Sequence, residues 1–159
     1  MISGILMFIH AISGAIAIGA GAWVLSGFLK GKLFKKGAIV FLKCAVVASA
    51  TGLLFPFHHL LPTHWAAMSS VYVSGVAVLS WRRYGLAGIW PLLFALSTML
   101  VWCLDISVVI AHVFELLIPT QHKMFLITES TVKLLFVGLG LFIVKRYRNS
   151  QVELMVRNK

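Results

Sequence analysis

Histidine and carboxylate side chains are the groups in this 159-residue chain that could bind a metal, a cofactor or a polar ligand; there are six His and four Asp or Glu. Asp105 and His112 are two helical turns apart and therefore share one face of a helix, and Glu115 follows one turn later. Glu129 precedes Lys133 by four residues, the spacing and order that favour an ion pair. Mutual neutralisation is the simplest role for that pair.

Imidazole and carboxylate groups bind transition metals, and two His on facing helices can hold a b-type haem. Three chemistries stay open: a b-haem between His10 and His112, a transition-metal site, and a small-molecule or quinone pocket lined by Asp105, His112, Trp102 and Glu129. The candidate binding residues are His10, His58, His64, Asp105, His112 and Glu129.

Motifs of catalysis are missing from the sequence. The segment HHLLPTH lacks the HExxH spacing of a zinc enzyme, and there is no GxSxG, SxxK or glycine-rich phosphate loop. We assign no catalytic residue, and a binding or structural role is favoured over an enzyme.

The elements that must position these residues are membrane helices. Hydrophobic residues make up 60% of the chain and charged residues 11%, with a mean hydropathy of +0.99, which excludes a soluble globular domain. We expect an all-α bundle of five transmembrane helices in residues 1–148, followed by a basic tail at 149–159. The predicted spans are 3–29, 38–57, 64–81, 89–117 and 124–144. The fourth is long, so a re-entrant piece is the alternative to one tilted helix.

The distribution of basic residues predicts which loops lie on which side of the membrane. The first loop, the third loop and the tail hold eleven of the fourteen Lys and Arg, whereas the second and fourth loops hold Lys123 alone. By the positive-inside rule this predicts an external N-terminus and a cytoplasmic C-terminus. All six histidines then lie on the external side. The cations indicate contact with the bilayer and its anionic lipids rather than with nucleic acid.

Two segments carry a resemblance. TGLLFPFHHLLPTH at 51–64 and DISVVIAHVFELLIPTQHKMF at 105–125 resemble an uncharacterised family of small bacterial five-helix inner-membrane proteins. The matching positions are His10, Thr51, Gly52, Pro56, His58, Pro62, His64, Pro119, Thr120 and Gln121. The chain departs from the family pattern at Asp105, where the family has Asn, and at His112, where it has Gln. The resemblance implies five helices in the cytoplasmic (inner) membrane and no established activity.

Three hypotheses about function follow. The leading one is a multispanning membrane protein with an outward-facing pocket of His and carboxylate groups that binds a small ligand or cofactor. The second is an accessory or structural subunit that docks another protein or a second copy of itself. The third is a redox membrane protein that holds b-haem or a metal.

Overall fold

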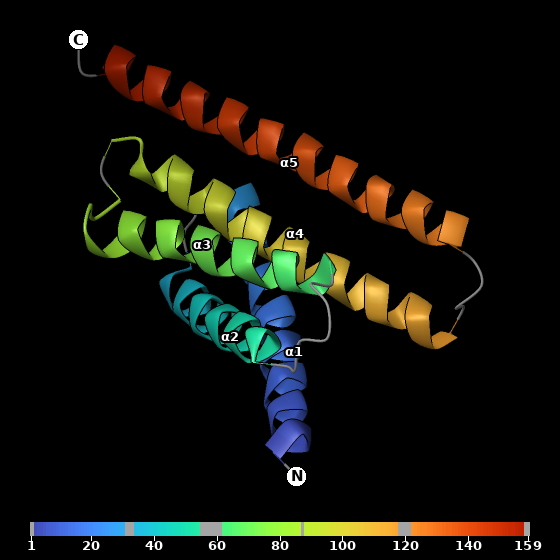
Figure 1. Ribbon diagram of the computed structural model, residues 1–159. Coiled ribbons are helices and arrows are strands. Elements are labelled where there is room, and N and C mark those ends of the chain that lie inside the picture. The colour runs from blue at the N-terminus through green and yellow to red at the C-terminus, as the bar shows by residue number, and fades with distance from the viewer. Residues whose placement is uncertain (1, 31–33, 55–61, 87, 118–121, 158–159) are drawn as a thin grey trace.

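The computed structural model describes residues 2–30, 34–54, 62–86, 88–117 and 122–157. All regular secondary structure in this part of the chain is helical, which confirms the all-α class (Figure 1). The five helices are α1 (Ile2–Leu29), α2 (Lys35–Leu53), α3 (Pro62–Arg82), α4 (Trp90–Leu117) and α5 (His122–Arg157).

Three helices can be compared with their predicted spans. The long fourth stretch is a single helix, with Pro91 in its first turn, where proline costs no backbone hydrogen bond. α2 ends at Leu53, earlier than the predicted 57. α5 continues to Arg157, well past the predicted end at 144, so most of the expected tail is helical.

In the part of the chain that the structure describes, four helices are long and apolar enough to cross a membrane: the segments are Gly4–Leu29, Lys35–Leu53, Trp90–Leu117 and Lys123–Arg146. The protein is therefore a helical membrane protein. Within the described residues α3 does not meet the same criterion. Its inward face carries Ser70, Ser74 and Ser80, all buried, which lower its hydropathy.

Helices that follow one another in the chain pack together, and α1 also contacts α4. Figure 1 shows α5 lying along α4 on one side of the molecule, while the N-terminal half of α1 extends away from both. Large apolar side chains on α1 and α5 are exposed, such as Phe8 at 67% and Leu134 at 71%. Such side chains suit contact with lipid tails.

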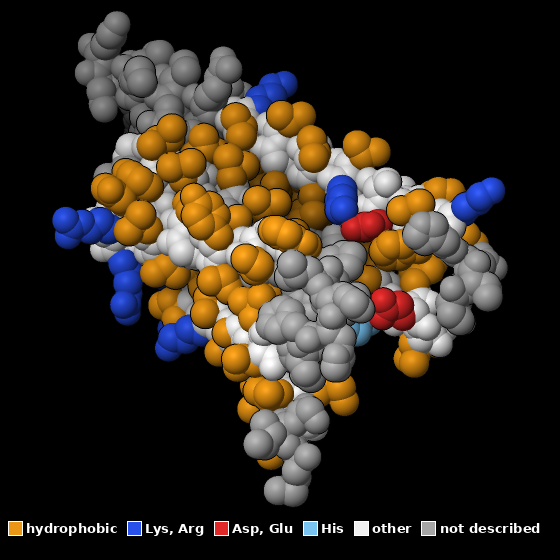
Figure 2. Space-filling model, viewed as in Figure 1, with side chains coloured by type: hydrophobic (Ala, Val, Ile, Leu, Met, Phe, Trp, Pro, Cys, Tyr) orange, Lys and Arg blue, Asp and Glu red, His pale blue; other side chains and the backbone are white. Residues whose placement is uncertain are grey.

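The helices alternate in direction and so define two ends. At the first end, Phe94 at the start of α4 packs edge to face on Phe28 at the end of α1 and on Trp81 at the end of α3. Arg146 of α5 donates a hydrogen bond to the carbonyl oxygen of Leu29 at this end. We call it the basic end, because the described side chains of Lys30, Lys35, Lys36, Arg82, Arg83, Lys145 and Arg146 all belong to it. Figure 2 shows several blue side chains along this edge.

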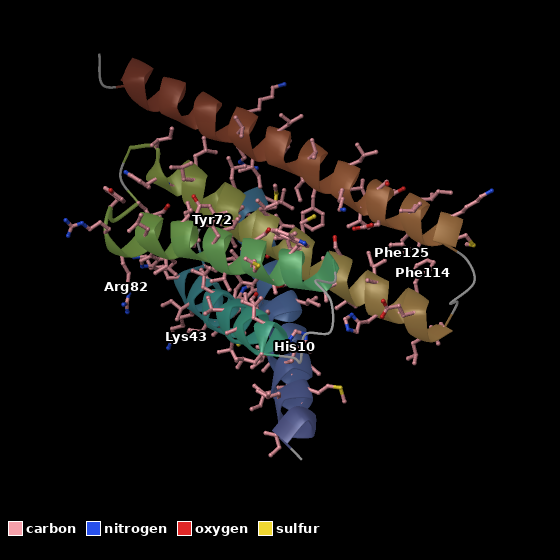
Figure 3. All side chains as sticks on the ribbon, in the orientation of Figure 1. His10, Lys43, Tyr72, Arg82, Phe114 and Phe125 are labelled. Atoms are coloured by element: carbon pink, nitrogen blue, oxygen red, sulfur yellow. The ribbon has the colours of Figure 1, made fainter. Side chains whose placement is uncertain are left out.

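The opposite end, the histidine end, comprises the start of α1, the end of α2, the start of α3, the end of α4 and the start of α5. His10 bonds to Ala48 here, and Phe114 of α4 packs on Phe125 of α5 at a centroid distance of 5.7 Å (Figure 3). The hydrophobic core lies nearer the basic end. Its fully buried members include Val24, Phe41, Ala77, Phe94 and Val101.

Candidate functional site

His10 lies where α1 meets the last turns of α2. Its Nδ1 is 2.8 Å from the carbonyl oxygen of Ala48 and 3.4 Å from Oγ1 of Thr51. Gly52 permits this approach, since a Cβ there would be 3.3 Å from Cε1 of His10. Thr51 and Gly52 therefore form the surface on which the imidazole rests.

The contact with Ala48 determines the tautomer of His10. A carbonyl oxygen only accepts hydrogen bonds, so Nδ1 is the donor and Nε2 of the neutral ring carries the lone pair. His112 shows the same arrangement on α4, with its Nδ1 2.9 Å from the carbonyl oxygen of Val108. Metal-binding histidines are commonly oriented by such a backbone contact. Both rings thus donate a hydrogen bond from Nδ1 to a backbone carbonyl oxygen.

Buried hydroxyl groups form, with the His10 contact, a polar layer between the apolar core and the histidine end. Ser49 of α2 donates to Ser70 of α3 at 2.9 Å. Ser13 of α1 and Thr51 of α2 donate to carbonyl oxygens of their own helices. The layer consists of His10, Ser13, Ser49, Thr51 and Ser70, and its four hydroxyl residues are each at most 9% exposed.

Asp105 lies in the same half of the bundle, on α4. It follows Val101 by one turn and so shares the face that packs into the core. Its Oδ2 is buried and has no hydrogen-bond partner among the described residues. A buried carboxyl oxygen without a partner is costly, above all at membrane depth, and this marks Asp105 as the most unusual polar group described in the chain.

The other two candidate binding residues that the structure describes, His112 and Glu129, are not fully buried. His112 is exposed, so the expectation that the whole Asp105 to His112 face points inward is wrong at His112. Glu129 forms the predicted ion pair with Lys133, at 2.6 Å between Oε1 and Nζ. The pair confirms the helical spacing argument and provides Glu129 with a partner.

His58 lies outside the described residues, as does the side chain of His64, although α3 includes residue 64. Within the described part, no group of three or more His, Cys, Asp or Glu side chains could hold a metal ion. A site with two protein ligands, such as a haem site, is a separate case.

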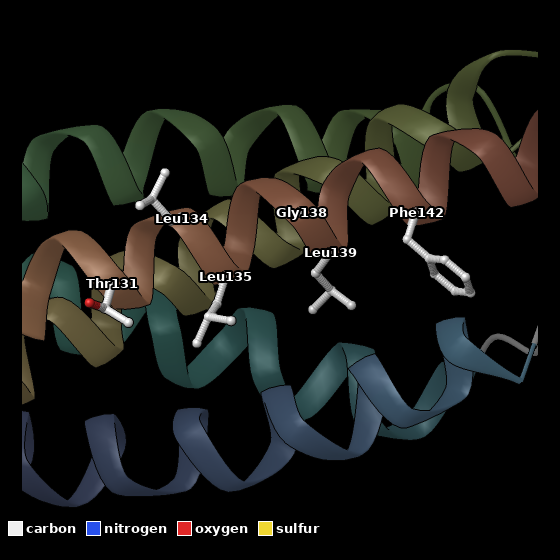
Figure 4. A pocket seen from close by; sticks show the side chains of 6 residues that line it. All are labelled: Thr131, Leu134, Leu135, Gly138, Leu139 and Phe142. Carbon is white, nitrogen blue, oxygen red and sulfur yellow. The ribbon is translucent and has the colours of Figure 1, made fainter.

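A groove of about 640 Å³ runs along one face of α5 (Figure 4). Its lining is apolar apart from one hydroxyl and consists of Thr131, Leu134, Leu135, Gly138, Leu139 and Phe142. None of the described candidate residues His10, Asp105, His112 and Glu129 lines it. The groove is thus an apolar surface of α5, distinct from the polar layer.

Trp102, expected to line a ligand pocket, instead joins three helices. Its indole N–H donates to the carbonyl oxygen of Ile18 at 3.0 Å, and its ring packs on Phe136 of α5. Sequence reasoning also missed the Ser49 and Ser70 pair. The small polar residues facing each other across α2 and α3 were the available signal, but their register is a tertiary property.

Comparison with known proteins adds no relative. No protein-family model matches the chain. No curated protein matches it, and no solved structure matches it.

Proposed function

We propose that this chain is a multispanning protein of the cytoplasmic membrane that binds a small ligand or cofactor in the polar half of its bundle. The observation that carries the proposal is the buried Oδ2 of Asp105, which has no partner among the described residues. Ionisable groups at membrane depth generally face a partner, a cavity or a ligand. A bound polar group would supply the hydrogen bond that Asp105 lacks.

The polar layer supports the same location. His10, Thr51 and the Ser49 and Ser70 pair lie in the same half of the bundle as Asp105. A quinone carbonyl or another small polar group would find both donors and acceptors there. Of the remaining candidates, His58, His64 and His112 would flank the site nearer the membrane surface, and Glu129 would act with Lys133.

The test compares two carboxylates on one helix. The protein is purified in native lipids, and bound small molecules are identified by native mass spectrometry for the unaltered chain, Asp105→Asn and Glu115→Gln. Glu115 is exposed on α4 and is the matched control. We expect a ligand mass that is lost in Asp105→Asn and kept in Glu115→Gln. Equal occupancy in the two variants would overturn the proposal, and a stoichiometric protein partner with no ligand would favour the accessory subunit instead.

A b-haem redox protein is the second candidate, favoured by the shared tautomer of His10 and His112. The imidazole of His112 or of His10 would be an axial ligand of the haem iron. Haemin is added to the purified protein and the absorbance spectrum recorded. A shift of the haemin Soret band that occurs with the unaltered chain and is missing with His10→Ala supports the haem version. Identical haemin spectra with the two proteins exclude it.

The orientation is part of the proposal. With the basic end in the cytoplasm, the polar half would face outward. Alkaline phosphatase, which is active only outside the cytoplasm, is fused after residue 59, after residue 120 and at the C-terminus. We expect activity from the first two fusions and none from the third; the reverse pattern would invert the topology.

A further inference from the structure

The described residues between α3 and α4 are 83–86, 88 and 89, and they form a turn. Gly85, Leu86 and Gly88 all have φ between 56° and 58°, the left-handed region. Leu86 is a rare non-glycine residue in that region, and its side chain packs against the hydrophobic core. Its N–H also bonds to the carbonyl oxygen of Ser80 at 3.2 Å. The turn is therefore anchored to the bundle by both side chain and backbone.

An aromatic pair closes the turn. Tyr84, after the end of α3, stacks on Trp90, the first residue of α4, with ring centroids 3.6 Å apart and an interplanar angle of 3°. Tyr84 is 42% exposed and Ile89 is 58% exposed. Tyr and Trp prefer the headgroup level of a membrane, and an exposed Ile beside them suits the adjoining hydrocarbon.

Two guanidinium groups flank this pair. Arg82 and Arg83 are exposed, and Figure 3 shows Arg82 extending away from the bundle. The ion pair within the described residues is that of Glu129 and Lys133, at the other half of the molecule, so neither arginine is neutralised by a described carboxylate. Arginine binds phosphate through two parallel hydrogen bonds, which lysine does not offer.

We propose that Arg82 and Arg83, at the turn between α3 and α4, form a binding site for the headgroup of an anionic phospholipid. The guanidinium groups of Arg82 and Arg83 bind the phosphate, and the stacked Tyr84 and Trp90 set the depth of the turn in the membrane. The site is independent of the ligand site around Asp105, which lies in the other half of the bundle.

The test uses two double variants of equal charge. The protein is released from micelles that contain equal amounts of phosphatidylglycerol and phosphatidylcholine, and retained lipids are counted by native mass spectrometry. Arg82→Gln with Arg83→Gln removes two cations from the turn, and Lys35→Gln with Lys36→Gln removes two exposed cations from the start of α2 at the same end. We expect the arginine variant to retain about tenfold less phosphatidylglycerol, and the lysine variant to lose much less.

A third variant, Arg82→Lys with Arg83→Lys, keeps the charge and removes the fork geometry. We expect intermediate retention from it, which a folding defect would not produce. Equal loss in the arginine and lysine variants would overturn the assignment to this turn. Equal retention of the two lipids by the unaltered protein would overturn the proposal as a whole.

Discussion

The indole ring of Trp102 occupies the space that a side chain at Gly21 would need. A Cβ on Gly21 would lie 2.3 Å from Cδ1 of Trp102. The ring cannot easily move aside, because its N–H is bonded to Ile18 and its other side packs on Phe136. This contact fastens α4 to α1 beside the hydrophobic core.

Gly21→Ala should therefore destabilise the protein despite the better helix propensity of alanine. We expect a cost of about 1–3 kcal/mol, typical of overpacking. Gly19→Ala is the matched control, since a Cβ there meets nothing within 4 Å. Thermal unfolding in detergent should show a lower midpoint for Gly21→Ala alone. If both variants unfold at the same temperature, the close approach is wrong.

The buried Ser49 and Ser70 pair predicts non-additive substitutions. Either single change to Ala leaves the other hydroxyl without its partner, at a cost of roughly 1 kcal/mol. The double variant removes both groups and should cost less than the sum of the singles. Unfolding midpoints of the four proteins complete the cycle, and strict additivity would show that the two hydroxyls do not interact.

Glu129 and Lys133 should behave as one unit. In lipid, Glu129→Leu leaves an unpaired ammonium group, and Lys133→Leu leaves an unpaired carboxyl group. Each single change is expected to make membrane insertion less favourable. The cost in insertion free energy is at most about 2–3 kcal/mol, the value for a charged residue at the centre of a membrane helix. The double change to Leu should insert normally. The amount of each variant in the membrane fraction measures its insertion. Normal insertion of both single variants would contradict the prediction that the two residues act as one unit.

Gly52→Ala tests the surface beneath His10. The added methyl group would be 3.3 Å from Cε1 of His10, so the ring must shift by a few tenths of an ångström. We expect a small loss of stability, about 1 kcal/mol or less, together with weaker binding of any ligand that contacts His10. Gly75→Ala on α3 meets nothing within 4 Å and serves as control. Identical ligand retention in the two variants would separate His10 from the site.

Properties that depend on neighbours in the chain could be predicted from the sequence alone. Five apolar runs predict five helices because a membrane-spanning helix satisfies its own backbone hydrogen bonds. The Glu129 and Lys133 pair depends on spacing within one helix, and the structure contains it. The gathering of cations at one end follows from alternating helix direction.

Tertiary structure decided which helix faces meet. His10 lies against Thr51 and Gly52 of α2, and Trp102 is held by α1 rather than facing a pocket. Asp105 has a buried oxygen without a described partner, whereas His112, on nearly the same face, is exposed. These outcomes depend on where each helix crosses its neighbours and how far it extends past them. Hydropathy and helical period describe one helix at a time, so they contain neither the crossing points nor the register between helices.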